Sequence, residues 1–510
     1  MTPVEVDIRD QLGDWHAGGG PLYLALADGL ERLLRQGTLA PATRLPSERR
    51  LAALLSVSRG TVVAAYETLR ERGLVSAKQG SGTVVNHGAS PFSGPREARL
   101  ATALAGGSIF RGLLEPEVGA RSGDGGLLDL RAACWSGDDG LPDDLFELDR
   151  AALATLRQGH GVFPAGIPEL RAAIADHLAA RGLPARPEEV VVTAGAQQAI
   201  ALLGHLLLGR GDVALVEDLT YPGAIEAFAA TEAQVVGVPL GPAGVDLDAL
   251  ERMVAQFRPR LVFLIPSAHN PTGVTMPALA RQRLAELATG WETVLIDNES
   301  LAETWLDEPP PPPVAAFQAS PQPRPATTPR RPGQVLTVGS LSKPAWGGLR
   351  IGWVHGPQAT MARLARLRTS QDLATSALSQ LIAVQVVRRL DELTSRRRAE
   401  HRRRLRAVRD ALNRELPEWS FAPPSGGHFL WVRLGDGSST ELAQLAAGAG
   451  VGIAPGPQFS PRRAYDGYLR LPYGLPPGTL AEGVRRLAAA WRAYRSTLDR
   501  CGSDRVDLLL

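Results

Sequence analysis

The stretch GSLSKPAWGGLRIGW (residues 339–353) decides how the fold is interpreted, because it holds Lys343. Of the 55 lysine and arginine residues in this 510-residue chain, only Lys343 and Lys78 are lysines. Arginine stays protonated at any usable pH, whereas a desolvated lysine can lose its proton and attack a carbonyl group. The presence of a lysine here indicates Schiff-base chemistry at Lys343. The alternative is that this lysine has no chemical role and remains by chance in a chain whose composition favours arginine.

Four motifs precede Lys343, and each follows a predicted strand. VVVTAGAQQAI (190–200) ends a strand and opens a helix, and the N–H groups at a helix N-terminus suit a phosphate. VEDLTYPG (216–223) offers an aromatic ring, IPSAHNPTG (265–273) an amide, and TVLIDNE (293–299) a carboxylate. The candidate residues in these motifs are Gly195, Ala196, Gln197, Tyr221, Asn270 and Asp297.

These groups match what pyridoxal phosphate requires of a protein: a lysine, an acid beside the pyridine nitrogen, a phosphate site and a ring to stack on. We expect Lys343 to be the catalytic residue, Asp297 to pair with the pyridine nitrogen, and Asn270 to donate to the phenolic oxygen. Each motif alone is a common turn or helix cap, and only their order is specific. No metal site is expected. Residues beside Lys343 complete the cofactor-binding set: Ser340, Ser342 and Arg350.

From about residue 127, apolar runs typical of strands alternate with amphipathic helical stretches, which predicts an α/β domain with a mainly parallel sheet. The proline-rich stretch 307–333 is expected to be a surface insertion. After about residue 385 an arginine-rich helix leads into a smaller α+β segment. Acidic residues are interspersed along that helix, so a solvated helix face is favoured over a nucleic-acid site.

The N-terminal segment predicts a DNA-binding module. In LPSERRLAALLSVSRGTVVAAYETLRERGLV (45–75), two short helices flank a turn at residues 56–58, and Ser47 is expected to cap the first helix. VSAKQGSGTVV (75–85) is typical of a hairpin with a glycine-rich tip. Basic residues outnumber acidic ones between positions 20 and 86, which suits a phosphate backbone. The alternative is a helical protein-interaction module.

Bulk composition excludes several other classes of protein. A net charge of +2 is too small for a polycation, so any nucleic-acid site must be local. Two cysteines make no disulfide framework and fit a reducing compartment. No apolar run is long enough to span a membrane and the N-terminus lacks a signal-peptide pattern. We therefore expect a cytoplasmic protein without membrane contact.

The motifs LPSER, SRGTV, AYETL and GSGTVV resemble the winged helix-turn-helix of GntR-type regulators. The resemblance implies that a recognition helix enters the major groove of double-stranded DNA. The module differs at Gly60, which has no side chain where a polar contact would be useful. The DNA-binding residues that the resemblance implies are Arg49, Arg59, Thr61, Lys78 and Gly80.

Residues 127–495 resemble fold-type-I pyridoxal phosphate enzymes of the aminotransferase class. In YLRLPYG, Arg470 matches the arginine that binds the substrate's carboxylate in that class, and it is the candidate for the effector carboxylate here. The chain departs from the pattern at three positions. Glu299 replaces a usual aromatic residue, Gly161 a tyrosine and Ala196 a frequent serine, and these losses should weaken cofactor binding or alter its chemistry.

Together the modules resemble the MocR family of regulators: a winged helix-turn-helix (15–86), a flexible linker (87–126) and an aminotransferase-like domain. We expect a large subdomain at about 155–385 and a small one at about 386–495. The resemblance implies a head-to-tail homodimer that senses pyridoxal phosphate, an amino-compound effector, or both, through Lys343 and so controls operator binding. An active aminotransferase with a DNA-binding appendage is the alternative, and a cofactor-free dimerisation scaffold is a third. Enzymatic activity beyond half-transamination is left open.

Overall fold

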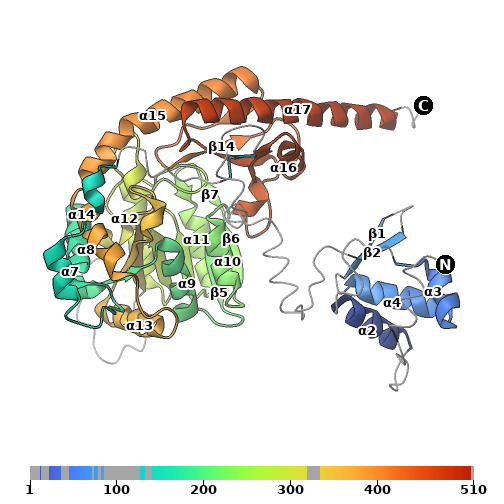
Figure 1. Cartoon of the computed structure of the whole chain (residues 1–510), viewed down its shortest axis with the longest axis horizontal. Helices are drawn as coiled ribbons and strands as arrows, with labels where there is room; N and C mark the ends of the chain where they lie inside the picture. Colours follow the sequence, from blue (N-terminus) through green and yellow to red (C-terminus); the bar gives the residue numbers. More distant parts are fainter. Residues whose placement is uncertain are drawn as a thin grey trace. The chain divides into compact units, whose positions relative to one another are not determined.

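A computed structural model describes residues 12, 22–35, 45–71, 74–78, 82–85, 127–131, 141–318 and 333–506 of the chain. The predicted linker, 87–126, lies outside these residues. The chain divides into two compact units, Met1–Ser108 and Ile109–Leu510, drawn in Figure 1. The predicted domain boundaries remain predictions, because the linker in which they fall is not described.

The N-terminal unit contains the expected pair of helices and hairpin. Ser56, in a left-handed conformation at φ 57°, ends the first helix of the pair and turns the chain into the second. Buried residues from the helices and the first strand, such as Leu26, Leu51 and Val62, form one core. The elements are α2 (Leu22–Arg35), α3 (Glu48–Leu55), α4 (Arg59–Glu71), β1 (Val75–Lys78) and β2 (Gly82–Val85).

Two details of this unit differ from expectation or lie outside the description. Ser47 is the N-cap of α3, but its side chain makes no capping hydrogen bond, so the predicted capping chemistry is wrong. The α3 start is held instead by Tyr66, whose hydroxyl donates to the Pro46 carbonyl at 2.8 Å. The strands β1 and β2 pair antiparallel, but Gly80 and the Lys78 side chain lie outside the described residues.

The larger unit is built on a seven-stranded sheet in the order β4-β12-β11-β10-β9-β5-β6. Only β12 runs antiparallel to its neighbours, so the predicted, mainly parallel sheet is confirmed. The strands are β4 (Val190–Thr193), β5 (Val213–Glu217), β6 (Gln234–Val238), β9 (Leu261–Leu264), β10 (Val294–Asn298), β11 (Gln334–Ser340) and β12 (Gly352–His355).

Helices bury both faces of this sheet, which explains why its strands are almost continuously apolar. Alternate strand residues point to opposite faces: Phe263 packs in the cluster with α9, α10 and α13, whereas Val262 packs with α11 and α12. The helices of this subdomain are α7 (Arg150–Leu156), α8 (Pro168–Ala180), α9 (Ala196–Leu207), α10 (Pro222–Ala229), α11 (Leu247–Phe257), α12 (Ala278–Gly290), α13 (Gln358–Thr369) and α14 (Ala377–Arg388).

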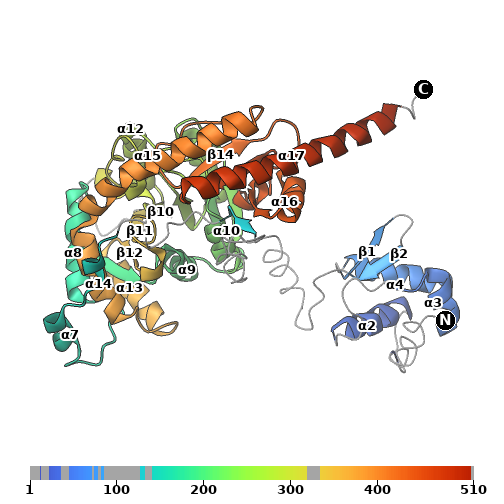
Figure 2. The same ribbon diagram turned by 45° about the horizontal axis from the view of Figure 1, so that its top comes forward.

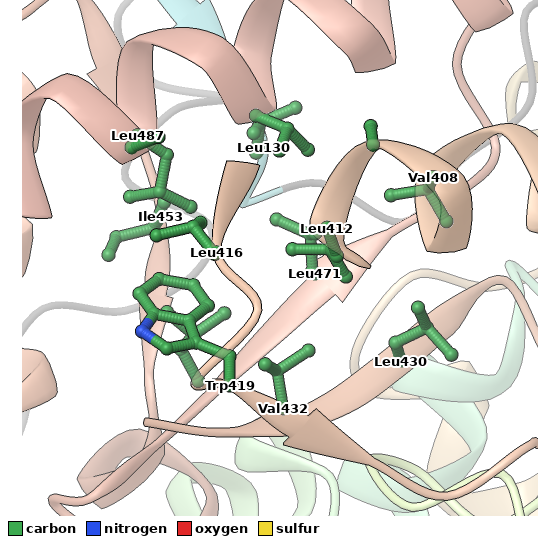
Figure 3. Packing of buried hydrophobic residues seen from close by; sticks show 14 of the residues in the cluster. Leu130, Val408, Leu412, Leu416, Trp419, Leu430, Val432, Ile453, Leu471 and Leu487 are labelled. Carbon is green, nitrogen blue, oxygen red and sulfur yellow. The ribbon is translucent and has the colours of Figure 1, made fainter. Parts of the chain in front are cut away.

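The C-terminal part forms the expected smaller α+β subdomain. Its four-stranded sheet has the order β13-β14-β17-β16, and α15 and α17 pack beside each other in both views (Figures 1 and 2). Figure 3 shows the apolar core between these helices and the sheet. The elements are α15 (Leu390–Glu415), β13 (Ser420–Phe421), β14 (Phe429–Arg433), α16 (Ser439–Gly448), β15 (Val451–Gly452), β16 (Ala454–Pro455), β17 (Tyr468–Pro472) and α17 (Pro477–Val506).

The arginine-rich α15 has the expected solvated face, on which Arg403 is 61% exposed. It also has a buried polar face that was not expected, formed by Arg397, His401 and Arg404, and the spacing of three to four residues between them was the available signal. One expectation is corrected in this unit. The proline-rich stretch is exposed near Asp307, but its described part then turns inward, and Val314 is fully buried. Among the described residues no helix is both long and apolar enough to cross a membrane.

Candidate functional site

The sequence motifs gather at one edge of the large sheet. Parallel strands point their carboxyl ends to the same edge, and ligands of such sheets bind there. The motifs follow β4, β5, β9, β10 and β11, which all run in one direction. The edge therefore brings together the segments that hold Gly195, Tyr221, Asn270, Asp297 and Lys343.

The β4–α9 turn has the backbone geometry of a phosphate site. Gly195 precedes α9 at φ +89°, a conformation that side chains disfavour. Gly352 of β12 backs against it so closely that a Cβ there would lie 2.6 Å from the Gly195 carbonyl carbon. Arg350 donates through Nη2 to the Ala194 carbonyl at 2.7 Å. The first-turn N–H groups of α9, including those of Ala196 and Gln197, have no preceding carbonyl in the helix and can serve an anion beside this guanidinium.

Asp297 is fully buried at the end of β10, and its two carboxylate oxygens differ. One accepts a hydrogen bond of 2.8 Å from the backbone N–H of Val314. The other, Oδ1, is buried without a hydrogen-bond partner among the described residues. Burial, reinforced by the negative charge of Glu299, raises the pKa of Asp297 to about 8. A buried carboxylate oxygen in this state fits a cationic N–H donor such as a pyridinium, so the site fits the cofactor.

Glu299 is held on the other side by an ion-pair network. Its Oε2 lies 2.7 Å from Arg181 Nη2, and its Oε1 lies 3.1 Å from Arg281 Nη1 and accepts from the Ser267 hydroxyl at 2.8 Å. Burial alone would raise the pKa of Glu299, but Arg281 and Arg181 outweigh it and lower the pKa. Its carboxylate is thus bound by three protein donors, two of which are arginines that offset its charge.

Lys343 is partly buried in the turn that follows β11. The Ser340 hydroxyl accepts from the Ser342 N–H at 3.1 Å and so shapes this turn. Behind the turn, Arg397 of α15 donates through Nη1 to the carbonyls of Pro344 at 2.9 Å and Ala345 at 2.5 Å. Lys343 also lies close enough to His428 for its charge to contribute, after burial and His401, to a lowered His428 pKa.

Asn270 and Arg470 meet across the two subdomains. Asn270 follows β9 and is joined to Pro271 by a cis peptide bond. Arg470 lies on β17, is 3% exposed, and donates through Nη1 to Asn270 Oδ1 at 3.2 Å. Its guanidinium carbon lies 4.9 Å from the ring centre of Phe459 and 5.3 Å from that of Phe429. A buried guanidinium can bind a carboxylate ligand through two parallel hydrogen bonds.

Tyr221 and Gln197 lie side by side at this edge. The backbone of Gly223 passes so close to both that a Cβ there would lie 2.3 Å from Gln197 Oε1 and 2.6 Å from the Tyr221 ring. Gln197 Nε2 donates to the Gly223 carbonyl at 2.9 Å. Gly161, by contrast, is exposed and has a φ of +73°. A Cβ added there would have no atom within 4 Å, so Gly161 contributes no contact to the site at the sheet edge.

In the N-terminal unit, the described candidate residues lie at the start of α3 and α4. Arg49 is exposed. The side chain of Arg59 is 64% exposed and pairs with Glu48 at 2.9 Å. The hydroxyl groups of Thr61 and Ser58 share a hydrogen bond of 2.8 Å, in which either can be the donor. The Ser58 hydroxyl also accepts from the Thr61 N–H. The start of α4, where a recognition helix reads base edges, is therefore fixed by a local cap and one ion pair.

Several residues of the site were not found by sequence reasoning. Arg181 reaches Glu299 across 118 positions, and Arg397 reaches Pro344 across 53, so no local pattern announces either contact. The Val314 N–H, which donates to Asp297, and the Arg131 carbonyl, which accepts from Arg470 Nη2 at 2.6 Å, are backbone groups and leave no side-chain signal at all. One signal was available: an acidic residue inside a buried strand end, as at Glu299, requires a cationic partner.

The match to known families covers both units. Residues 148–487 match the family model for aminotransferase class I and II, and residues 22–85 match the model for bacterial regulatory proteins of the gntR family. The chain is similar to the solved structure of LysN, an alpha-aminoadipate aminotransferase from Thermus thermophilus, in complex with N-(5'-phosphopyridoxyl)-L-leucine. The TM-score is 0.67 at 31% identity, over 79% of this chain and 98% of that one.

The chain therefore belongs to the aminotransferase class I and II family, whose fold relatives depend on pyridoxal phosphate, and it carries a gntR-type DNA-binding domain. The "Probable rhizopine catabolism regulatory protein MocR" of Rhizobium meliloti is 26% identical over 94% of this chain and 95% of its own. The HTH-type transcriptional regulator TauR of Rhodobacter capsulatus is 29% identical over 93% of this chain and 97% of its own. The chain is a regulator of this MocR type, and domains of its aminotransferase class are typically dimeric.

Proposed function

We propose that the aminotransferase-type unit senses a small amine that carries a carboxylate, using pyridoxal phosphate bound at Lys343, and thereby controls how the gntR-type domain binds its operator. The observation that carries this proposal is the unpartnered Oδ1 of Asp297, buried at the sheet edge that also holds Lys343. A dimerisation scaffold has no use for a buried carboxylate oxygen without a donor, because such a group destabilises the fold.

The residues divide the task of holding the cofactor. Bound pyridoxal phosphate supplies an aldehyde that condenses reversibly with primary amines. The first turn of α9 and Arg350 would bind its phosphate, and Ser340 would keep the Lys343 turn in shape. Asp297 would hold a proton between its Oδ1 and the ring nitrogen. Because Val314 already fixes the other oxygen, Oδ1 is the atom that remains for this contact.

The chemistry of Arg470 defines the effector class. Its guanidinium is buried between two aromatic rings and contacts Asn270. A planar cation of this kind binds a carboxylate through two parallel hydrogen bonds and favours it over a neutral group. Lys343 selects a primary amine, since exchange at a Schiff base requires one. The effector we propose is therefore an amino acid or a related amino carboxylate, and the sensing unit would act as a head-to-tail homodimer.

The first experiment compares the visible spectrum of the full chain, wild type and Lys343→Ala, after addition of pyridoxal phosphate. We expect an absorption band at the visible edge in the wild type and its loss in the variant. Lys78→Ala is the matched control, because it removes the other lysine of the chain and should leave the band unchanged. Absence of the band from the wild type, or its persistence in Lys343→Ala, would refute the assignment of Lys343.

Full transamination is a second candidate activity, and one observation favours it. Glu299, which stands where the aminotransferase class usually has an aromatic residue, is bound by Arg181, Arg281 and Ser267, so two arginines offset its charge. The same loaded protein, mixed with L-leucine and 2-oxoglutarate, separates the two activities. A regulator without turnover converts at most one equivalent of amine per site, whereas an aminotransferase continues to form product.

A further inference from the structure

Residues 127–131 join the small subdomain as an added strand, although they precede the whole large subdomain in the sequence. The strand β3 (Leu128–Asp129) pairs in parallel with β15. The Leu128 N–H donates to the Gly450 carbonyl at 2.9 Å, and the Leu130 N–H donates to the Gly452 carbonyl at 2.8 Å. The Leu130 side chain is fully buried and lies among the core residues of α15, α17, β14 and β17 (Figure 3).

The main chain of this segment also contacts Arg470. The Nη2 group of Arg470 donates to the Arg131 carbonyl at 2.6 Å, while Nη1 donates to Asn270 Oδ1 at 3.2 Å. Two uncharged oxygens, one from residues 127–131 and one from the loop after β9, thus hold the guanidinium from two directions. Undocking of residues 127–131 would remove one of these two contacts from the guanidinium.

Asp129 fixes the Arg131 carbonyl in position. Its Oδ1 accepts from the backbone N–H of Arg131 at 2.8 Å and from Arg131 Nε at 2.8 Å. Both side chains are largely buried, at 18% and 17% exposure, so this is more than a surface ion pair. Removing the Asp129 carboxylate removes the hydrogen bonds that hold the N–H and the side chain of Arg131, the residue whose carbonyl Arg470 binds, without touching Arg470 itself.

We propose that docking of residues 127–131 and binding of the effector's carboxylate at Arg470 are positively coupled. A guanidinium that is already oriented loses less side-chain freedom when it binds a carboxylate, so the docked segment favours the ligand. Linkage makes the effect reciprocal, and the ligand favours the docked segment. Residues 127–131 are the first described stretch after residue 85, so they lie on the covalent path between the DNA-binding unit and the sensing unit. This inference rests on the proposed function, and it states how binding of the effector at that site changes residues 127–131.

Hydrogen exchange of the full-length protein tests the coupling with two stable adducts that differ in one group. N-(5'-phosphopyridoxyl)-L-leucine carries the carboxylate, and N-(5'-phosphopyridoxyl)-3-methylbutylamine lacks it. At saturation, we expect the amides of Leu128 and Leu130 to exchange about tenfold more slowly with the first adduct than with the second, within the usual range of allosteric coupling. Equal exchange with both bound adducts would overturn the inference alone. Failure to bind either adduct would overturn the proposed function as well.

The reciprocal test uses Asp129→Ala and measures the affinity of both adducts. We expect about a tenfold loss of affinity for the leucine adduct and no change for the adduct without a carboxylate. Asp212→Ala is the matched control, because Asp212 also binds a backbone N–H, of Gly209 at 2.9 Å, and an arginine, Arg260 at 3.4 Å. It precedes β5, at the sheet end opposite the site, and should change neither affinity. Equal loss for both adducts in Asp129→Ala would show a merely structural role and would refute the coupling.

Discussion

At the scale of single residues, the site combines two carboxylates with opposite protonation behaviour. Asp297 and Glu299 are two positions apart on one chain segment and both are buried. Arg281 and Arg181 lower the pKa of Glu299, whereas burial and the negative charge of Glu299 together raise the pKa of Asp297. Two carboxylates whose environments separate their pKa values in this way have different tasks. We propose that Glu299 is structural and that Asp297 faces the ligand.

The raised pKa of Asp297 predicts a pH dependence of stability in the cofactor-free protein. Its folded pKa, about 8, lies above the ordinary aspartate pKa of 3.8, so the folded state binds this proton more tightly. The stabilisation is complete below the unfolded pKa and is lost as the pH rises through about 8. We expect the free energy of unfolding of Asp297→Asn, which is neutral at every pH, to rise relative to that of the wild type by about 4 kcal/mol between pH 5 and pH 9. Urea unfolding of both proteins at three pH values measures this.

Asp212→Asn serves as the control, since Asp212 is a partly exposed carboxylate in a turn. A difference between wild type and Asp297→Asn that stays constant from pH 5 to pH 9 would contradict the protonation assigned to Asp297.

At the scale of elements, α15 links the small subdomain to the turn that carries Lys343. Arg397, His401 and Arg404 form the buried polar face of this helix, and Arg397 binds the two carbonyls that follow Lys343. Burial, together with the charges of Arg397 and Arg404, lowers the pKa of His401 to about 3, so the imidazole is neutral there. The helix therefore brings the fixed positive charge of Arg397 against the turn that carries Lys343, and the neutral ring of His401 against His428.

We predict that Arg397→Met weakens pyridoxal phosphate binding about tenfold, because the Pro344 and Ala345 carbonyls lose a charged donor that orients the lysine turn. Arg403→Met, one turn and a half along the same helix, is the control. Its side chain is 61% exposed and pairs with Glu400, so its loss should change stability by less than about 0.5 kcal/mol. Titration with pyridoxal phosphate, followed by absorbance, compares the two, and equal affinities would rule out this role for Arg397.

The sequence predicted the elements better than the contacts between them. The strands before Thr193, Asp297 and Ser340 are apolar runs with clear ends, so both the sheet and the edge that holds the motifs could be inferred. The inward turn of the proline-rich stretch could not be inferred. The Val314 N–H donates to the carboxylate of Asp297, 17 residues earlier, and no periodicity in the sequence indicates that hydrogen bond. The buried face of α15 was missed for a similar reason: arginines favour solvent unless distant carbonyls accept from them.

At the scale of the whole molecule, the chain holds two compact units, each with its own apolar core. In the smaller unit, Leu26, Leu51 and Val62 pack with one another, and no residue of that core belongs to the clusters described in the larger unit. A ligand that binds only the folded form of one unit stabilises that unit by mass action and leaves an independent unit unchanged.

Calorimetry of the full-length chain should therefore show two transitions, of which pyridoxal phosphate moves only one. At one hundred times the dissociation constant, the cofactor adds about 2.7 kcal/mol, which corresponds to about 3 °C for a unit of this size. The smaller transition, from the gntR-type unit, should stay in place, and Lys343→Ala should reduce the shift of the larger one. A single transition that moves as a whole would mean that the two units unfold together. Effector signals would then reach the DNA-binding domain through a shared folding equilibrium rather than through residues 127–131.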